Sequence, residues 1–114
     1  MKPRVLCIAL VIALASAYAG SWSTFLTCGS AVSVSYAKVD DKTYTWKFRN
    51  DGDRRITYLK FSYSYQDADT NQPKTETDTL PGSLKPGEIL GGWAAFTANA
   101  RSQPAIKILQ TDRE

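Results

Sequence analysis

The chain has 114 residues, with 14 Lys and Arg, 11 Asp and Glu, two cysteines and no histidine, which gives a formal net charge of +3. This length suits a single domain, and 22% charged residues against 43% hydrophobic residues exclude an intrinsically disordered chain. Without histidine, the chain has no Ser-His-Asp or Cys-His nucleophile pair, no imidazole metal ligand and no histidine pH switch.

Residues 1–19 have the layout of a secretory signal peptide, because two basic residues precede an apolar run and small residues at 17 and 19 follow it. We expect cleavage after Ala19, with Ala17 as the alternative. The run is about half the ~20 apolar residues that a membrane span needs, so we expect a secreted or periplasmic chain with no transmembrane anchor. Cleavage leaves 12 basic and 11 acidic side chains, a net charge of +1, and this charge gives no argument for nucleic-acid binding.

Cleavage also removes Cys7, so Cys28 becomes the lone cysteine of the mature chain. We expect a buried, inert free thiol at Cys28, since unpaired cysteine behaves as a small hydrophobic residue. A dimer linked through Cys28 is the alternative. Residues 20–29 are expected to be a lead-in to the folded domain.

Alternating polar and apolar residues predict β-strands throughout residues 30–111, and no window shows helical spacing. Segments 30–38 and 43–50 predict a hairpin whose aromatic face is buried and whose polar face is solvated. A turn at 50–53 leads into a strand over 55–67, where the position of Ile56 predicts a bulge or a twist near Thr57 and Tyr58.

The second half of the chain continues in strands. A polar loop at 67–73 precedes residues 74–80, which are rich in threonine and charge and therefore predict an edge strand. Two Pro-Gly turns lead to a strand over 89–98, in which Gly91-Gly92 predicts a bulge or a close backbone approach. A last strand covers 104–111 before a frayed tail at 112–114. The pattern predicts an all-β fold, a two-sheet antiparallel immunoglobulin-like sandwich of about seven short strands, with a small closed barrel as the alternative.

Two turns carry a family resemblance: Asn50-Asp51-Gly52 follows an early strand, and Leu84-Lys85-Pro86-Gly87-Glu88 precedes a late one. With the core residues Trp46 and Phe61, they resemble small exported bacterial immunoglobulin-like domains of the FxLyD and telokin-like kind. The resemblance covers residues 30–110 and implies the sandwich fold, with no catalytic residue to carry over. The glycine that often ends the D-x-D-G loop of those domains is absent here, where Thr70-Asn71 stands.

One loop has the spacing of a calcium site. Asp67, Asp69 and Asn71 place oxygen ligands at positions 1, 3 and 5, and Asp78 places a carboxylate at position 12. Gln72 stands where the sharp turn of such a loop needs glycine. The alternative is a hairpin loop whose side chains bond to their own backbone, and we expect no cofactor.

Three aromatic residues are candidates for a binding surface. Tyr58 and Trp93 fall on strand faces opposite the main apolar ones, and Trp22 precedes the first strand. We do not expect an enzyme, because the available carboxylates fall in edge-strand and turn contexts. We expect a non-catalytic exported module that binds a protein through the edge strand 74–80 or near Tyr58 and Trp93. A carbohydrate-binding module that uses the same aromatic residues is the alternative.

Overall fold

The computed structural model describes residues 22–92 and 95–114, and within these ranges the chain forms strands and no helix. The eight strands are β1 (Leu26–Gly29), β2 (Val32–Lys38), β3 (Thr43–Asn50), β4 (Ile56–Gln66), β5 (Pro73–Thr79), β6 (Ile89–Gly91), β7 (Thr97–Asn99) and β8 (Ala105–Arg113). No helix in these ranges has the length and apolar character that crossing a membrane requires.

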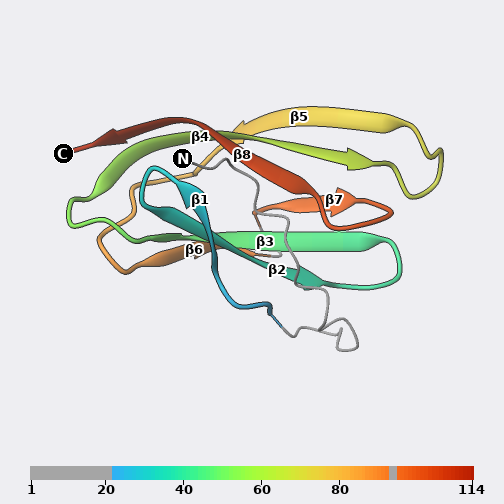
Figure 1. Ribbon diagram of the computed structural model, residues 1–114, viewed down its shortest axis with the longest axis horizontal. Coiled ribbons are helices and arrows are strands. Elements are labelled where there is room, and N and C mark those ends of the chain that lie inside the picture. The colour runs from blue at the N-terminus through green and yellow to red at the C-terminus, as the bar shows by residue number, and fades with distance from the viewer. Residues whose placement is uncertain (1–21, 93–94) are drawn as a thin grey trace.

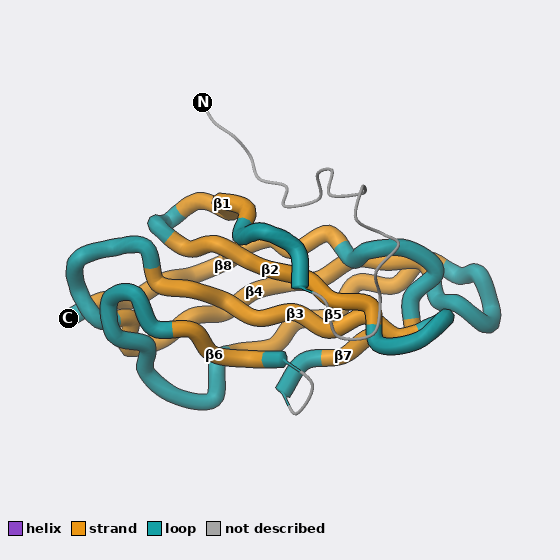
Figure 2. The backbone as a smooth tube through the Cα atoms, turned by 90° about the horizontal axis from the view of Figure 1, so that it is seen from below, coloured by secondary structure: helices purple, strands orange, loops and turns teal. Residues whose placement is uncertain are grey.

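The strands form two antiparallel sheets that lie one over the other (Figures 1 and 2). The five-stranded sheet has the order β1-β2-β3-β6, with β7 also pairing with β3, and the three-stranded sheet has the order β5-β4-β8. The predicted all-β, two-sheet antiparallel sandwich is confirmed, with eight strands where about seven were expected, and the two sheets of the described residues do not close into a barrel. The bulge predicted near Thr57 and Tyr58 is present as a register shift between Ile56 and Tyr58.

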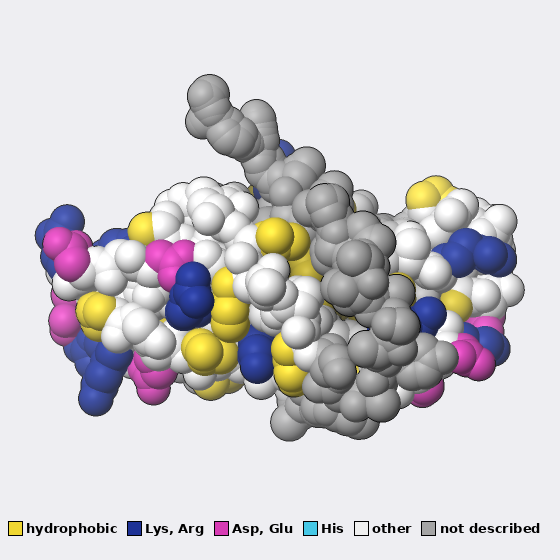
Figure 3. Space-filling view, turned by 60° about the horizontal axis from the view of Figure 1, so that its bottom comes forward, with side chains coloured by type: hydrophobic (Ala, Val, Ile, Leu, Met, Phe, Trp, Pro, Cys, Tyr) yellow, Lys and Arg dark blue, Asp and Glu magenta, His cyan; other side chains and the backbone are white. Residues whose placement is uncertain are grey.

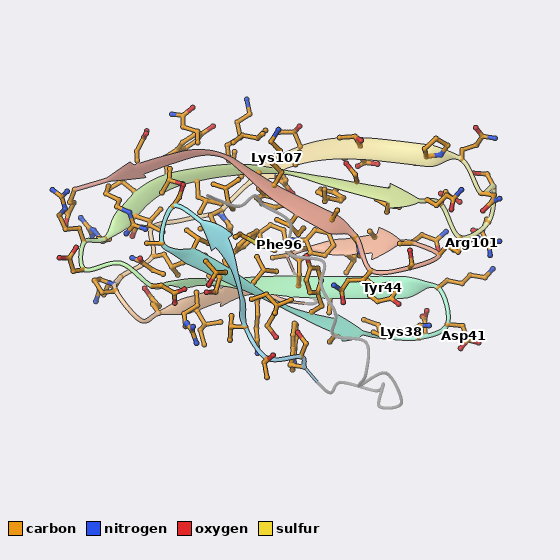
Figure 4. The ribbon with its side chains drawn as sticks, viewed as in Figure 1. Lys38, Asp41, Tyr44, Phe96, Arg101 and Lys107 are labelled. Carbon is orange, nitrogen blue, oxygen red and sulfur yellow. The ribbon has the colours of Figure 1, made fainter. Side chains whose placement is uncertain are left out.

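An aromatic core fills the space between the sheets. Trp46 and Phe48 of β3 are fully buried and face Phe61 of β4, with ring centroids 6.4 and 4.7 Å away. Phe96, which Figure 4 places between the two sheets, meets Phe61 edge-on at 5.1 Å. Each such side chain contributes about 1.5–3 kcal/mol by leaving water, so these rings hold the two sheets together.

The segment expected to be a lead-in contains a strand that sequence reasoning missed. β1 pairs with β2 through a two-residue turn, and Gly29 lies opposite Val32. The turn residues Ser30 and Ala31 both have left-handed φ angles, 56° and 57°. Such a tight turn normally carries Asn-Gly or Asp-Gly, and this signal is absent.

The prediction of a single strand over 89–98 is also wrong, because β6 and β7 are separate strands on the same edge of β3. The chain leaves the sheet after Gly91 and Gly92, whose φ angles are 126° and 99°. A Cβ atom at Gly91 would lie 2.9 Å from both Lys47 Cα and the Trp46 carbonyl oxygen. This close approach needs glycine and ends the strand where a continuous one was expected.

The C-terminus is not frayed, as β8 continues to Arg113. The Arg113 guanidinium donates to the Asn50 side-chain oxygen at 2.9 Å and to the carbonyls of Arg54 and Ser30 at 2.8 and 2.7 Å. With a further contact to the Ala31 carbonyl at 3.2 Å, four hydrogen bonds from one side chain join the strand end to two turns. The frayed tail was predicted from its position at the chain end, and these tertiary contacts show that the prediction is wrong.

Candidate partner-binding edge

β5 is the edge strand that the sequence predicted. Among the described strands it pairs with β4 alone, so its other side has no neighbour in the sheet. Residues 73–78 are all exposed, and Figure 1 shows the strand along the margin of the sandwich. An exposed edge of this kind offers unpaired backbone groups to another strand.

Two backbone hydrogen bonds show which β5 residues face β4. Leu80 donates its N–H to the Leu59 carbonyl at 3.0 Å, and Asp67 donates its N–H to the Gln72 carbonyl at 2.9 Å. Both pairs share the register that joins the two strands, and hydrogen-bonded pairs in an antiparallel ladder recur at every second residue. The even-numbered residues of β5 therefore bond to β4, and the odd-numbered ones direct their N–H and C=O groups to the open edge.

The open edge is short. Pro73 has no N–H group, and the N–H of Thr79 donates to the Asp78 carboxylate at 2.8 Å. Between these two positions, Thr75 and Thr77 direct both their N–H and their C=O groups away from β4. An added strand therefore has two consecutive hydrogen-bonding positions on β5.

The side of β5 that faces the tyrosines of β4 carries Lys74, Glu76 and Asp78. Tyr63 donates its hydroxyl to one oxygen of the Glu76 carboxylate at 3.2 Å, and Tyr65 donates to the other at 3.0 Å. The two rings stack with centroids 5.9 Å apart and planes 8° apart. Burial, together with the Glu76 charge, raises the pKa of both phenols to about 12, so both remain protonated donors at neutral pH.

In the sequence, Tyr63 and Tyr65 alternate with Ser62 and Ser64, a pattern that predicts inward-facing tyrosines but gives no link to Glu76. Both rings are half-buried, packed against the core. The link appears only in the register, which sets Tyr63 opposite Glu76 and Tyr65 opposite Lys74. The one signal in the sequence was the matching alternation of the two strands, and alternation does not specify register.

The three aromatic candidates do not form one surface. Tyr58 is 37% exposed on the three-stranded sheet, where it lies opposite Asp112. Trp22 is half-buried on the other sheet, bridged to Ala37 of β2. Trp93 lies outside the described residues, so its predicted exposure stays a prediction.

Trp22 covers the outer face of the five-stranded sheet. The Lys47 ammonium lies 4.0 Å from its ring centroid, and a Cβ atom at Gly92 would lie 3.7 Å from its indole. Ser35 donates its hydroxyl to the Ser23 carbonyl at 2.6 Å, and this face of β2 is buried where a solvated one was expected. Figure 3 shows hydrophobic side chains among Lys and Arg on this side of the molecule.

The predicted calcium ligands are not brought together. Asp78 lies opposite Phe61 in the ladder, whereas Asp67 is at the far end of β4, about 20 Å away at 3.3 Å per residue. Asp69 pairs with Lys42 at 2.7 Å. Asn71 has a left-handed φ of 64°, and the described residues contain no cluster of three or more metal-ligating side chains.

Asp67 instead organises its own loop. One carboxylate oxygen accepts the N–H groups of Asp69 and Thr70 at 2.8 and 2.9 Å, and the other lies 3.2 Å from the Lys74 ammonium. These backbone bonds, Thr70 first, lower the pKa of Asp67 to about 2. The alternative interpretation of this segment, a loop capped by its own side chains, describes its structure.

Cys28 is 7% exposed, which confirms that its side chain is buried. The expected free thiol is not found: Cys28 is disulfide-bonded, and the described residues contain no free cysteine. The prediction counted cysteines after removal of residues 1–19, whereas the full chain retains Cys7, which lies outside the described residues.

Comparison of the chain with protein-family models, with curated proteins and with solved structures finds no significant match.

Proposed function

We propose that the chain is an exported, non-catalytic β-sandwich module of the immunoglobulin-like kind that binds a protein partner in the cell envelope or outside the cell. The observation that carries this proposal is the β5 edge, where Thr75 and Thr77 offer backbone donors and acceptors to an extended segment. Strand addition to an exposed sheet edge is a common mode of peptide recognition. The two turns that resemble those of FxLyD and telokin-like domains support the immunoglobulin-like part of this proposal.

The contacts of the carboxylates support a binding role over catalysis. Glu76 accepts from two protonated phenols, Asp78 accepts from the backbone of Thr79, and Glu88 accepts the N–H of Lys85 at 2.8 Å. Each of these carboxylates is held by contacts within the fold, and glycoside hydrolysis requires two carboxylates that face one substrate bond.

A proline substitution tests the edge directly. Thr77→Pro removes an N–H that points away from β4, so the ladder with β4 remains intact, and edge strands tolerate proline. Thr77→Val keeps the N–H and is the matched control. We expect envelope or secreted extracts of the source cells to yield a partner captured by the wild type and Thr77→Val but lost with Thr77→Pro, with equal thermal unfolding midpoints. Equal capture by the folded Thr77→Pro chain would contradict the proposal.

A carbohydrate-binding module is the second candidate, and the geometry supports it less. Sugar recognition by aromatic rings needs faces that are open to the ligand, but Trp22 has Lys47 over its ring and Tyr58 belongs to the other sheet. A glycan array that compares the wild type with Tyr58→Ala separates the two candidates.

Export has its own test. The intact mass of the chain recovered from the periplasm or the medium is expected to correspond to a start at Gly20. Recovery of an uncleaved chain from the cytoplasm alone would contradict export.

A further inference from the structure

The β5 edge carries two carboxylates that no cation balances. The Lys74 ammonium forms an ion pair with the Asp67 carboxylate at 3.2 Å. Glu76 contacts the two phenols and Asp78 contacts the Thr79 backbone, and no described Lys or Arg forms an ion pair with either carboxylate. Negative charge therefore stands at alternate positions on one side of the strand.

Strand addition would place partner side chains next to these charges. When Thr75 and Thr77 form the hydrogen-bonded pairs with an antiparallel segment, Glu76 lies between them in a non-hydrogen-bonded pair. In such pairs the facing Cβ atoms are about 4.5–5.5 Å apart, which brings a Lys or Arg opposite Glu76 within ion-pair distance. A second basic residue two positions away lies opposite Asp78.

We infer that the β5 edge selects an extended partner segment with Lys or Arg at two alternate positions, opposite Glu76 and Asp78. This inference rests on the proposed strand addition and names the chemistry of the partner. The two phenols fix the Glu76 carboxylate, and a carboxylate has further lone pairs for an incoming cation.

A second copy of the chain does not fit this pattern. β5 has the sequence PKTETDT, so Lys74 is its one basic residue and is already paired with Asp67. Self-pairing about Glu76 would set two carboxylates against each other, which is unfavourable in directly opposed positions. Self-pairing about Thr75 would set Lys74 opposite Glu76, but it would also place Pro73, which has no N–H, opposite Thr77 and leave Asp78 without a basic residue opposite it. The charges on the edge therefore favour a different, cationic strand.

Fluorescence anisotropy with synthetic peptides tests the inference. The probe is Thr-Lys-Thr-Lys-Thr-Glu-Thr, labelled and amidated, and its comparison is the charge-reversed Thr-Glu-Thr-Glu-Thr-Lys-Thr. A third peptide carries N-methyl groups on the threonines of the probe and so lacks the edge hydrogen bonds. We expect the probe to bind the full chain about ten-fold more tightly than the charge-reversed peptide at low salt, as two surface ion pairs provide.

Variants and outcomes separate the two proposals. The double variant Glu76→Gln/Asp78→Asn should abolish the preference, while Asp53→Asn, an exposed turn carboxylate, should keep it. Equal binding of both charged peptides with loss of the N-methylated one would overturn the charge selection and leave strand addition standing. Undiminished binding of the N-methylated peptide would overturn strand addition and the inference with it, and no binding of the probe at millimolar concentration would overturn the inference.

Discussion

Asn50 is a buried polar residue whose removal should cost more than that of any single surface contact. Its amide donates to the carbonyls of Arg54 and Leu84, both at 2.9 Å, and its oxygen accepts from Gly52 N–H and Arg113, also at 2.9 Å. The side chain is 0% exposed. One residue thus ties the end of β3 to the next turn, to the Pro-Gly loop and to the last strand.

Asn50→Leu removes all four hydrogen bonds while keeping the number and branching of the side-chain heavy atoms. Each bond is worth about 1 kcal/mol net, and Arg113 and Leu84 keep other partners, since Arg113 also contacts the Arg54 carbonyl and the Leu84 carbonyl also accepts from Ile56. We expect the free energy of unfolding to fall by about 3 kcal/mol. For a domain of this size that loss corresponds to a fall in Tm on the order of 15 °C.

Urea unfolding followed by tryptophan fluorescence measures this loss, because Trp46 is fully buried and reports the state of the core. Arg113→Ala removes one of the four Asn50 hydrogen bonds, together with the exposed contacts of Arg113 to three backbone carbonyls, and should cost about 1–2 kcal/mol. Asp53→Ala, exposed in the same turn, should stay within about 0.5 kcal/mol of the wild type. A folded Asn50→Leu chain within about 1 kcal/mol of the wild type would refute the reasoning.

Three further predictions concern single sites. Gly91→Ala should destabilise the chain by about 2 kcal/mol, because its Cβ would lie 2.9 Å from Lys47 Cα. Gly82→Ala is the control, since a Cβ there has no atom within 4 Å, and the same urea assay compares the two variants. The pKa of Asp67 is lowered from 3.8 to about 2, so its carboxylate contributes stability that is present above about pH 4 and is lost as the pH falls through 2. In Asp67→Asn, the urea midpoint of unfolding should therefore depend less on pH between about 4 and 2. An unchanged pH dependence would contradict the Asp67 contacts. Tyr63 and Tyr65, with a pKa of about 12, should ionise near pH 12 in an absorbance titration at about 295 nm. The stability of the chain should fall as the pH rises from about 10 through 12. Glu76→Gln should lower the pKa of both phenols.

The sequence was informative where local signals agree with tertiary structure. β3 matches the predicted segment 43–50, because strict alternation and a polar turn at each end define it. β5 was expected as an edge because it lacks apolar residues, and the structure shows an edge. In both cases the side chains that decide burial lie within the segment itself.

Where the sequence was uninformative, the decisive groups lie elsewhere in the chain. β1 has four residues, and the two central residues of its turn, Ser30 and Ala31, are not the Asn or Gly that mark such a turn, so the local pattern resembles a lead-in. The outer face of β2 looks solvated by alternation, but Ser35 is buried under the segment that contains Ser23. The Glu76 contact needed the register of two strands, and Arg113 reaches turns more than fifty residues away.

The open edge of β5 is short, and its length limits how much backbone hydrogen bonds can contribute to the affinity for a partner strand. Two positions, Thr75 and Thr77, allow about four backbone hydrogen bonds, worth roughly 0.5–1.5 kcal/mol each. Association costs an estimated 4–15 kcal/mol in lost translational and rotational freedom, so these bonds alone do not hold a partner. Pro73 and the Asp78–Thr79 contact, which limit the open edge, also protect it from indiscriminate pairing. If a partner strand adds to this edge as proposed, its affinity would therefore depend on the side chains beside the edge, and Glu76, held by two phenols, is the group best positioned to contribute.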